Sequence, residues 1–172
     1  MDIQAFGQTL KIKSKKTTLA LDPKPSVTKF DADVILVTDK DYDASRINNY
    51  RLIIDGPGEY EISGLKVYGQ STGQGIIYSV LSENLNAIIT KSSFLKGLSS
   101  DKIGEYQVVI INSDSEVEES KITAMEPNVV VLFGDRASES AKILGKENAS
   151  ISPKISVSSE KLPEETEIFV TG

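Results

Sequence analysis

Short apolar stretches separated by polar turns fill the first half of the chain, in the pattern that β-strands produce. Apolar and polar residues alternate around Ile3 and over residues 10–12, and continuous apolar runs cover residues 34–37 and 52–54. Alternation predicts a strand with one buried face, whereas a short continuous run predicts a strand buried on both faces. The first half is therefore expected to be mostly β-sheet.

Two hairpins are predicted in the middle of the chain. They span residues 60–68 and 76–89, and the turns fall at residues 63–64 and 83–84. Glycine, serine and asparagine suit these turns because they tolerate the backbone conformations that tight hairpins require.

The second half alternates predicted strands with predicted helices. The strands cover residues 108–111, 129–133, 155–157 and 168–170, and the helices cover residues 115–125 and 137–144. Many strands followed by strand–helix alternation predict two packed sheets with helices on the outside. A length of 172 residues fits a single domain over residues 1–172.

Charge and hydropathy narrow the classes of partner. The formal net charge is −6 and the isoelectric point about 4.8, which argues against binding to nucleic acid or to an anionic membrane. The one basic cluster, Lys11, Lys13, Lys15 and Lys16, is predicted to charge an exposed hairpin edge. Because no apolar run reaches membrane-spanning length and the N-terminus lacks a signal-peptide pattern, we expect a cytoplasmic protein.

The chain contains no histidine and no cysteine. This composition excludes disulfides, thiol nucleophiles and iron–sulfur clusters held by cysteine. It also removes the imidazole and thiolate ligands on which zinc sites are built.

An acidic loop follows the apolar run at residues 34–37. It carries Asp39, Asp41 and Asp43 at every second position, in a place where α/β proteins gather ligands. Carboxylates suit hard cations such as Mg²⁺, Mn²⁺ and Ca²⁺. The spacing is similar to the opening of a calcium loop, but the glycine and the final glutamate of that motif are missing. A solvated acidic loop and a cation site both remain open.

Several segments resemble one family when taken together. Residues 19–23 read Leu-Ala-Leu-Asp-Pro, residues 32–45 combine Ala-Asp, an apolar run and the acidic loop, and residues 54–61 contain Pro-Gly-Glu-Tyr-Glu. With Leu-Pro-Glu-Glu-Thr at residues 162–166, they resemble the metallo-β-lactamase superfamily, in particular the branch containing ascorbate-6-phosphate lactonase. The resemblance implies a four-layer αββα sandwich of two mixed β-sheets with helices outside.

The family's zinc motif is degenerate in this chain. The first two motif histidines are replaced by Asp39 and Asp41, the motif aspartate matches Asp43, and the last motif histidine is Ala44. The family's bridging aspartate falls near Lys91, which brings a positive charge in place of a carboxylate.

The two remaining family histidines have no counterpart either. One would fall within residues 71–75 and the other near residues 133–134, and neither stretch contains a histidine. Bound zinc and the zinc-dependent hydrolysis of the family are therefore not expected.

These patterns predict a pseudoenzyme, a catalytically inactive binding or structural module with no catalytic residue and no cofactor. The alternative is a metal-dependent hydrolase that holds Mg²⁺, Mn²⁺ or Ca²⁺ at Asp39, Asp41 and Asp43. The sequence names no small-molecule ligand. Because Tyr68 and Tyr78 lie in segments with few charges, we expect a homodimer or a protein partner to use the surface near them.

Overall fold

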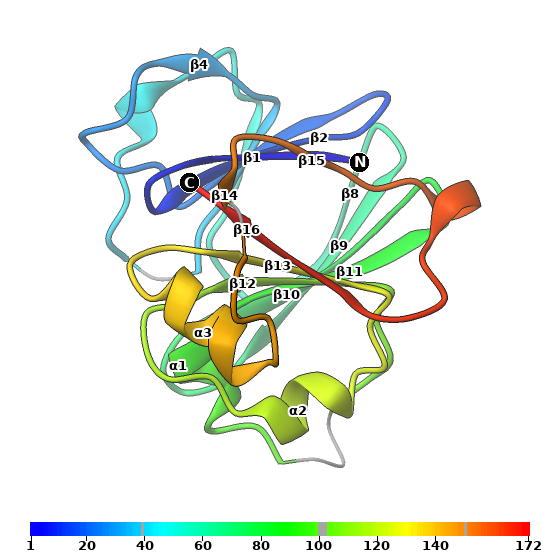
Figure 1. Cartoon of the computed structure of the whole chain (residues 1–172). Helices are drawn as coiled ribbons and strands as arrows, with labels where there is room; N and C mark the ends of the chain where they lie inside the picture. The colour runs from blue at the N-terminus through cyan, green and yellow to red at the C-terminus, as the bar shows by residue number, and fades with distance from the viewer. Residues whose placement is uncertain (39, 100–102, 150) are drawn as a thin grey trace.

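Two β-sheets packed face to face form the centre of the protein, and the three short α-helices found among the described residues lie on one side (Figure 1). A computed structural model describes residues 1–38, 40–99, 103–149 and 151–172. The prediction that Asp39 is a metal ligand therefore concerns a residue outside the described ranges.

The first sheet has six strands in the order β15-β1-β2-β3-β5-β7. Its members are β1 (Asp2–Phe6), β2 (Thr9–Lys13), β3 (Thr18–Leu21), β5 (Val34–Leu36), β7 (Leu52–Ile54) and β15 (Ile155–Ser156). The strands β1, β2 and β3 are antiparallel, whereas β3, β5 and β7 run parallel. The apolar runs predicted as buried strands are β5 and β7.

The second sheet has eight strands in the order β14-β16-β13-β12-β11-β10-β9-β8. They are β8 (Gly58–Ile62), β9 (Leu65–Ser71), β10 (Ile76–Ser82), β11 (Leu85–Lys91), β12 (Val108–Asn112), β13 (Val129–Phe133), β14 (Ile151–Ser152) and β16 (Glu167–Thr171). Strands β8 to β11 form an antiparallel meander, and β11, β12, β13 and β16 are parallel. Both predicted hairpins are confirmed.

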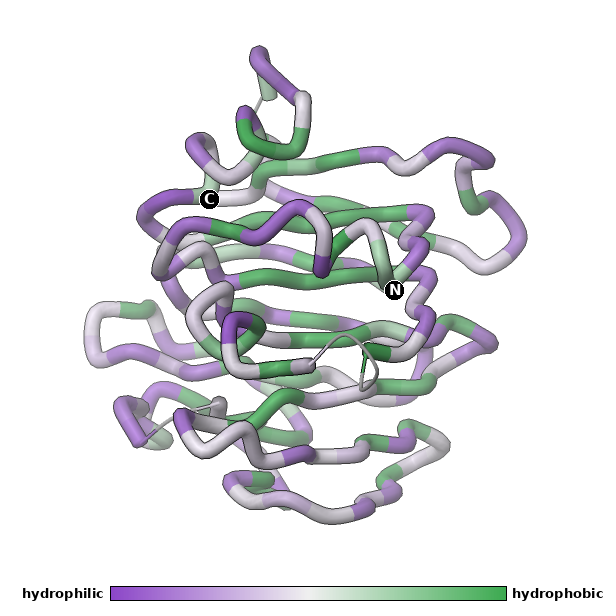
Figure 2. Tube along the Cα trace, turned by 90° about the horizontal axis from the view of Figure 1, so that it is seen from below, coloured by the Kyte–Doolittle hydropathy of each residue, from purple (hydrophilic) through white to green (hydrophobic). Residues whose placement is uncertain are grey.

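The main core fills the space between the sheets. Alternate residues of each strand point into it, as Leu19 and Leu21 do from β3 and Ile89 and Ile110 from the second sheet. Figure 2 shows the strands as mostly hydrophobic bands whose connecting turns are mostly hydrophilic. Burial of these side chains is the main source of stability for such a sandwich.

Helices cover only one of the two outer faces in the described part of the chain. They are α1 (Ser92–Leu95), α2 (Glu119–Thr123) and α3 (Ala137–Ile143), and they share a second apolar cluster with the eight-stranded sheet. The helix predicted at residues 115–125 is much shorter in the structure, where α2 covers only Glu119–Thr123. No helix among the described residues is long and apolar enough to span a membrane.

The outer face of the first sheet carries an irregular cap instead of α-helices. The cap contains β4 (Phe30–Asp31), β6 (Ile47–Asn48) and a single 3₁₀ turn at Ala44–Arg46, and it packs on Ile35 and Val37. These residues lack the apolar spacing of a helix, and Pro23 and Pro25 oppose a regular helix in the stretch that leads into β4. The expected mixed α/β sandwich is confirmed, with this difference in one outer layer.

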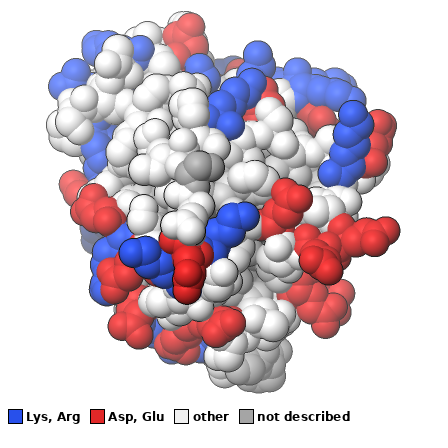
Figure 3. Space-filling view, in the orientation of Figure 1, with Lys and Arg blue, Asp and Glu red and all other residues white. Residues whose placement is uncertain are grey.

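The predicted position of the lysine cluster is wrong. Strand β2 lies between β1 and β3, so Lys11 and Lys13 are inside the sheet and not at its edge. Lys15 and Lys16 are exposed at the turn that follows, and the ammonium of Lys11 lies 5.1 Å from the ring centroid of Phe30. Figure 3 shows basic and acidic side chains interspersed on one face, around a broad uncharged area.

Candidate functional site

The ends of parallel strands from both sheets meet at one end of the sandwich. A methyl group placed on Gly75 would come within 2.7 Å of the carbonyl oxygen of Thr38, after β5, and within 2.3 Å of the ring of Phe94, after β11. Gly75 also lies one residue before Ile76, whose N–H donates to the Thr38 carbonyl at 3.0 Å. This meeting point is where α/β proteins place functional groups.

Polar side chains are buried at this end of the sandwich. They are Asp22, Thr38, Thr90, Lys91, Ser92, Asn112 and Ser113. Lys91 and Asn112 are partners in the register of β11 and β12, and Ile89 and Ile110, two residues before them, belong to the core between the sheets. Strand alternation therefore directs Lys91 and Asn112 toward the space between the sheets.

Lys91 places an ammonium group at this position. The residue is 8% exposed, and its Nζ lies 5.7 Å from the ring centroid of Phe94. A lysine is seldom buried to this extent, because desolvating its charge is costly. The aromatic ring offers part of the compensation through a cation–π contact.

Asp22 joins the ends of β3 and β5. Its carboxylate accepts a hydrogen bond from the backbone N–H of Thr38 at 2.7 Å and another from the Thr38 hydroxyl. Asp22 has φ +44°, a left-handed conformation that aspartate tolerates better than most residues. The buried carboxylate is thus part of the scaffold that fixes both strand ends.

Tyr78 connects the two sheets. Its hydroxyl donates to the carbonyl oxygen of Val37 at 2.8 Å and lies 3.0 Å from the carbonyl oxygen of Ile54. Burial, followed by the negative charge of Asp22, raises the pKa of the Tyr78 hydroxyl. Tyr78 itself cannot form part of a contact surface, because it is on the inner face of β10 and completely buried. The expected homodimer or partner contact near Tyr68 and Tyr78 stays a prediction. Tyr68 is exposed, as predicted.

Asp41 and Asp43 each contact a different cationic side chain in the acidic loop. The carboxylate of Asp41 is 2.7 Å from the ammonium of Lys24 and is 82% exposed. Asp43 accepts a hydrogen bond from the backbone N–H of Ser45 at 3.0 Å and lies 3.4 Å from Nε of Arg46. Hydrogen bonding by the side chain of Ser45, and to a lesser extent by its backbone N–H, lowers the pKa of Asp43.

These contacts give both aspartates structural roles. Over the described ranges, no group of three or more histidine, cysteine, aspartate or glutamate side chains is placed to hold a metal ion. The three-carboxylate site, which includes Asp39, stays a prediction.

The donor set at the strand ends does not fit the zinc site that the family resemblance implies. Zinc prefers imidazole and thiolate ligands, and the chain has neither. Lys91 brings a positive charge to the end of β11, where the family resemblance implies a bridging carboxylate. No chemical step through a zinc ion follows from these residues.

A cleft of about 420 Å³ opens beside Thr38. Its polar wall comes from the loops after β5 and β7 and from the β9–β10 loop, and includes Lys40, Tyr42, Asp55 and Gln74. The volume is in the range of small-molecule sites, roughly 300–1,000 Å³. Sequence reasoning missed Tyr42 and Gln74 as lining residues, because single polar residues in separate loops form no pattern. Their positions after strand ends were the only signal.

Comparison with known proteins identifies the architecture. No protein-family model matches the chain, and no curated protein is significantly similar to it in sequence. A candidate zinc-dependent hydrolase of the metallo-β-lactamase superfamily from Thermotoga maritima superposes with a TM-score of 0.75 at 17% identity, over 99% of this chain and 98% of that one.

Two further solved structures agree with this match. The metallo-β-lactamase fold protein YhfI from Bacillus subtilis has a TM-score of 0.61 at 6% identity, covering 98% of this chain and 95% of its own. A candidate metal-dependent hydrolase from Veillonella parvula has a TM-score of 0.56 at 12% identity, over 91% of this chain and 98% of that one. The chain therefore has the metallo-β-lactamase fold.

Proposed function

We propose that this protein is a pseudoenzyme, a metal-free binding module on the metallo-β-lactamase fold. The observation that carries the proposal is the buried ammonium of Lys91 at the strand-end position, in a chain without histidine or cysteine. The resemblance of residues 54–61 supports placing it near the ascorbate-6-phosphate lactonase-like branch, and a cytoplasmic location is part of the same proposal.

Electrostatics explains why Lys91 and a zinc centre are incompatible neighbours. A unit charge and a divalent ion about 4 Å apart repel each other by on the order of 8 kcal/mol at an effective dielectric constant of about 20. Carboxylate ligands would have to overcome this repulsion. Asp41 is already paired with Lys24, and Asp43 already caps the 3₁₀ turn.

The alternative function is a hydrolase that uses Mg²⁺, Mn²⁺ or Ca²⁺ at the acidic loop. Its support is the chemistry of Asp39, Asp41 and Asp43, since hard cations accept an all-oxygen ligand set. For Asp41 and Asp43, an ion would have to replace the contacts with Lys24 and Arg46. We therefore prefer the metal-free module.

Thermal unfolding with and without metal ions distinguishes the two functions. An ion that binds only the folded state raises the melting temperature, by an amount that grows with its concentration over its dissociation constant. We expect the same melting temperature in EDTA, in Zn²⁺ and in millimolar Mg²⁺, Mn²⁺ or Ca²⁺. A rise with one hard cation that disappears in Asp41→Ala, and persists in the matched surface variant Asp135→Ala, would favour the alternative.

A further inference from the structure

We propose that the edge strand β8 receives an extended, basic segment of a partner protein as an added strand. The inference deepens the proposed binding function by naming the surface and the chemistry of the partner. It rests on residues of β8 and its groove that do not include Lys91, so it can be tested separately.

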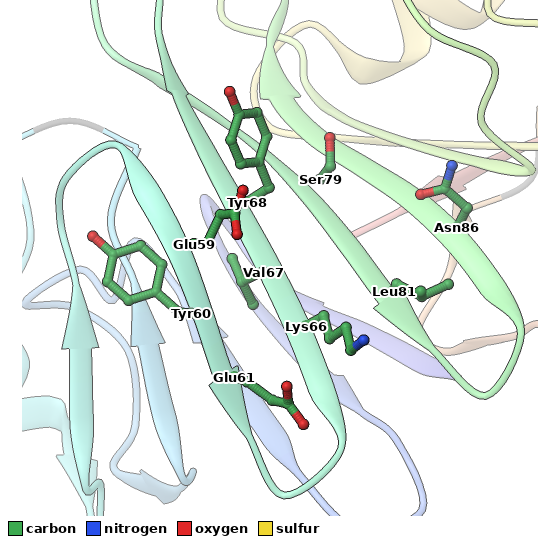
Figure 4. A pocket seen from close by; sticks show the side chains of 9 residues that line it. All are labelled: Glu59, Tyr60, Glu61, Lys66, Val67, Tyr68, Ser79, Leu81 and Asn86. Atoms are coloured by element: carbon green, nitrogen blue, oxygen red, sulfur yellow. The ribbon is translucent and has the colours of Figure 1, made fainter.

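The outer face of the second sheet is uncovered at its β8 end. The helices contact β11, β13 and β16, whereas β8 pairs only with β9 among the described strands. A shallow groove of about 510 Å³ crosses this uncovered face (Figure 4). It exposes two large apolar side chains, Tyr68 at 49% and Leu81 at 45%.

The register of the β8–β9 hairpin leaves the backbone N–H and C=O groups of two β8 residues pointing toward the free edge of the sheet. Ser63 and Gly64 form a two-residue turn with φ +49° and +81°, so the flanking pair Ile62 and Leu65 is hydrogen-bonded. Bonded and non-bonded pairs then alternate along the ladder. The N–H and C=O groups of Glu59 and Glu61 consequently point away from β9, and no described residue bonds to them.

The side chains of these two residues define the charge of the partner. Glu59 and Glu61 are exposed on the same outer face, where they form one wall of the groove (Figure 4). On the β9 side, Glu61 is already opposite Lys66. Opposite charges across a strand pair are stabilising and like charges are destabilising. A strand added to the free side is therefore expected to place lysine or arginine opposite both glutamates.

The same argument disfavours a second copy of this chain at the edge. Because the free backbone groups belong to Glu59 and Glu61, pairing β8 with its own copy would place glutamate opposite glutamate. A charged edge can also serve only to prevent aggregation. That role alone does not require the exposed Tyr68 on the neighbouring strand β9, whereas peptide recognition by strand addition uses pockets next to the edge.

The test is an NMR titration of the whole isotope-labelled chain with synthetic peptides. The probe is a seven-residue peptide of alternating arginine and valine, which should shift the amide signals of residues 58–62 and protect the amides of Glu59 and Glu61 from exchange. A peptide of the same composition in two blocks controls for unspecific charge. A third peptide, N-methylated at alternate residues, removes backbone pairing but keeps every charge.

Charge reversal completes the design. In the double variant Glu59→Lys with Glu61→Lys, affinity for the arginine peptide should fall about tenfold, and an alternating glutamate–valine peptide should bind instead. The matched control, Glu119→Lys with Glu126→Lys, changes the net charge equally and should bind like the parent chain. Equal binding of the block or N-methylated peptide, shifts outside β8 and its groove, no binding, or a β8-paired dimer of the free chain would each overturn the proposal.

Discussion

Replacing Tyr78 by alanine is expected to lower the free energy of unfolding by about 4 kcal/mol, as large aromatic-to-alanine changes in cores do. The ring is completely buried between the sheets. It packs so closely against Gly69 that a methyl group placed on that glycine would come within 3.0 Å of the ring. The substitution therefore leaves a cavity that the surrounding strands cannot close. Urea unfolding followed by circular dichroism measures the change.

Tyr78→Phe separates the hydroxyl from the ring. It keeps the packing and loses the hydrogen bonds to the carbonyls of Val37 and Ile54, which should cost about 1 kcal/mol. The raised pKa of Tyr78 means that its contribution is complete below the unfolded-state value of about 10 and is lost as pH rises above it. The phenylalanine variant should lack this alkaline loss. A parent chain and variant with identical stability at every pH would contradict the assigned role.

The second large effect is expected for Asp22→Ala, at about 3 kcal/mol. The substitution leaves the buried N–H and hydroxyl of Thr38 without their carboxylate acceptor. Alanine also tolerates the left-handed backbone at φ +44° less well than aspartate does.

Asp22→Asn is the matched control for this prediction. Asparagine accepts the left-handed conformation and offers one oxygen acceptor, so it should retain part of the stability that alanine loses. Thermal and urea unfolding of both variants gives the comparison. Equal losses would show that the negative charge, and not the hydrogen-bond geometry, sets the contribution of Asp22.

The strands were predictable because their signals are local. The continuous apolar runs became β5 and β7, and the turn residues at positions 63–64 and 83–84 adopt the positive φ values that hairpins need. The outer layers were harder to predict because they depend on packing. The segments at residues 30–32 and 42–48 cover the first sheet without the periodic apolar pattern of a helix, so this cap could not be inferred.

The site was only partly predictable from the residues. The absence of histidine and the position of Lys91 pointed to a changed centre, and Lys91 is buried there. The burial of Tyr78 depends on which face of β10 packs against the core, and the sequence of β10 does not show which face that is. The partner of Asp41, Lys24, is distant in sequence and could not be inferred, whereas Arg46 lies only three residues after Asp43.

The metal content of the purified protein tests the central claim most directly. The chain should be expressed with added zinc, purified without chelator, and measured by inductively coupled plasma mass spectrometry against the protein concentration. A metal-free centre built around Lys91 predicts only trace zinc, manganese and iron after gel filtration. One tightly bound zinc ion per chain, retained through gel filtration, would contradict the account.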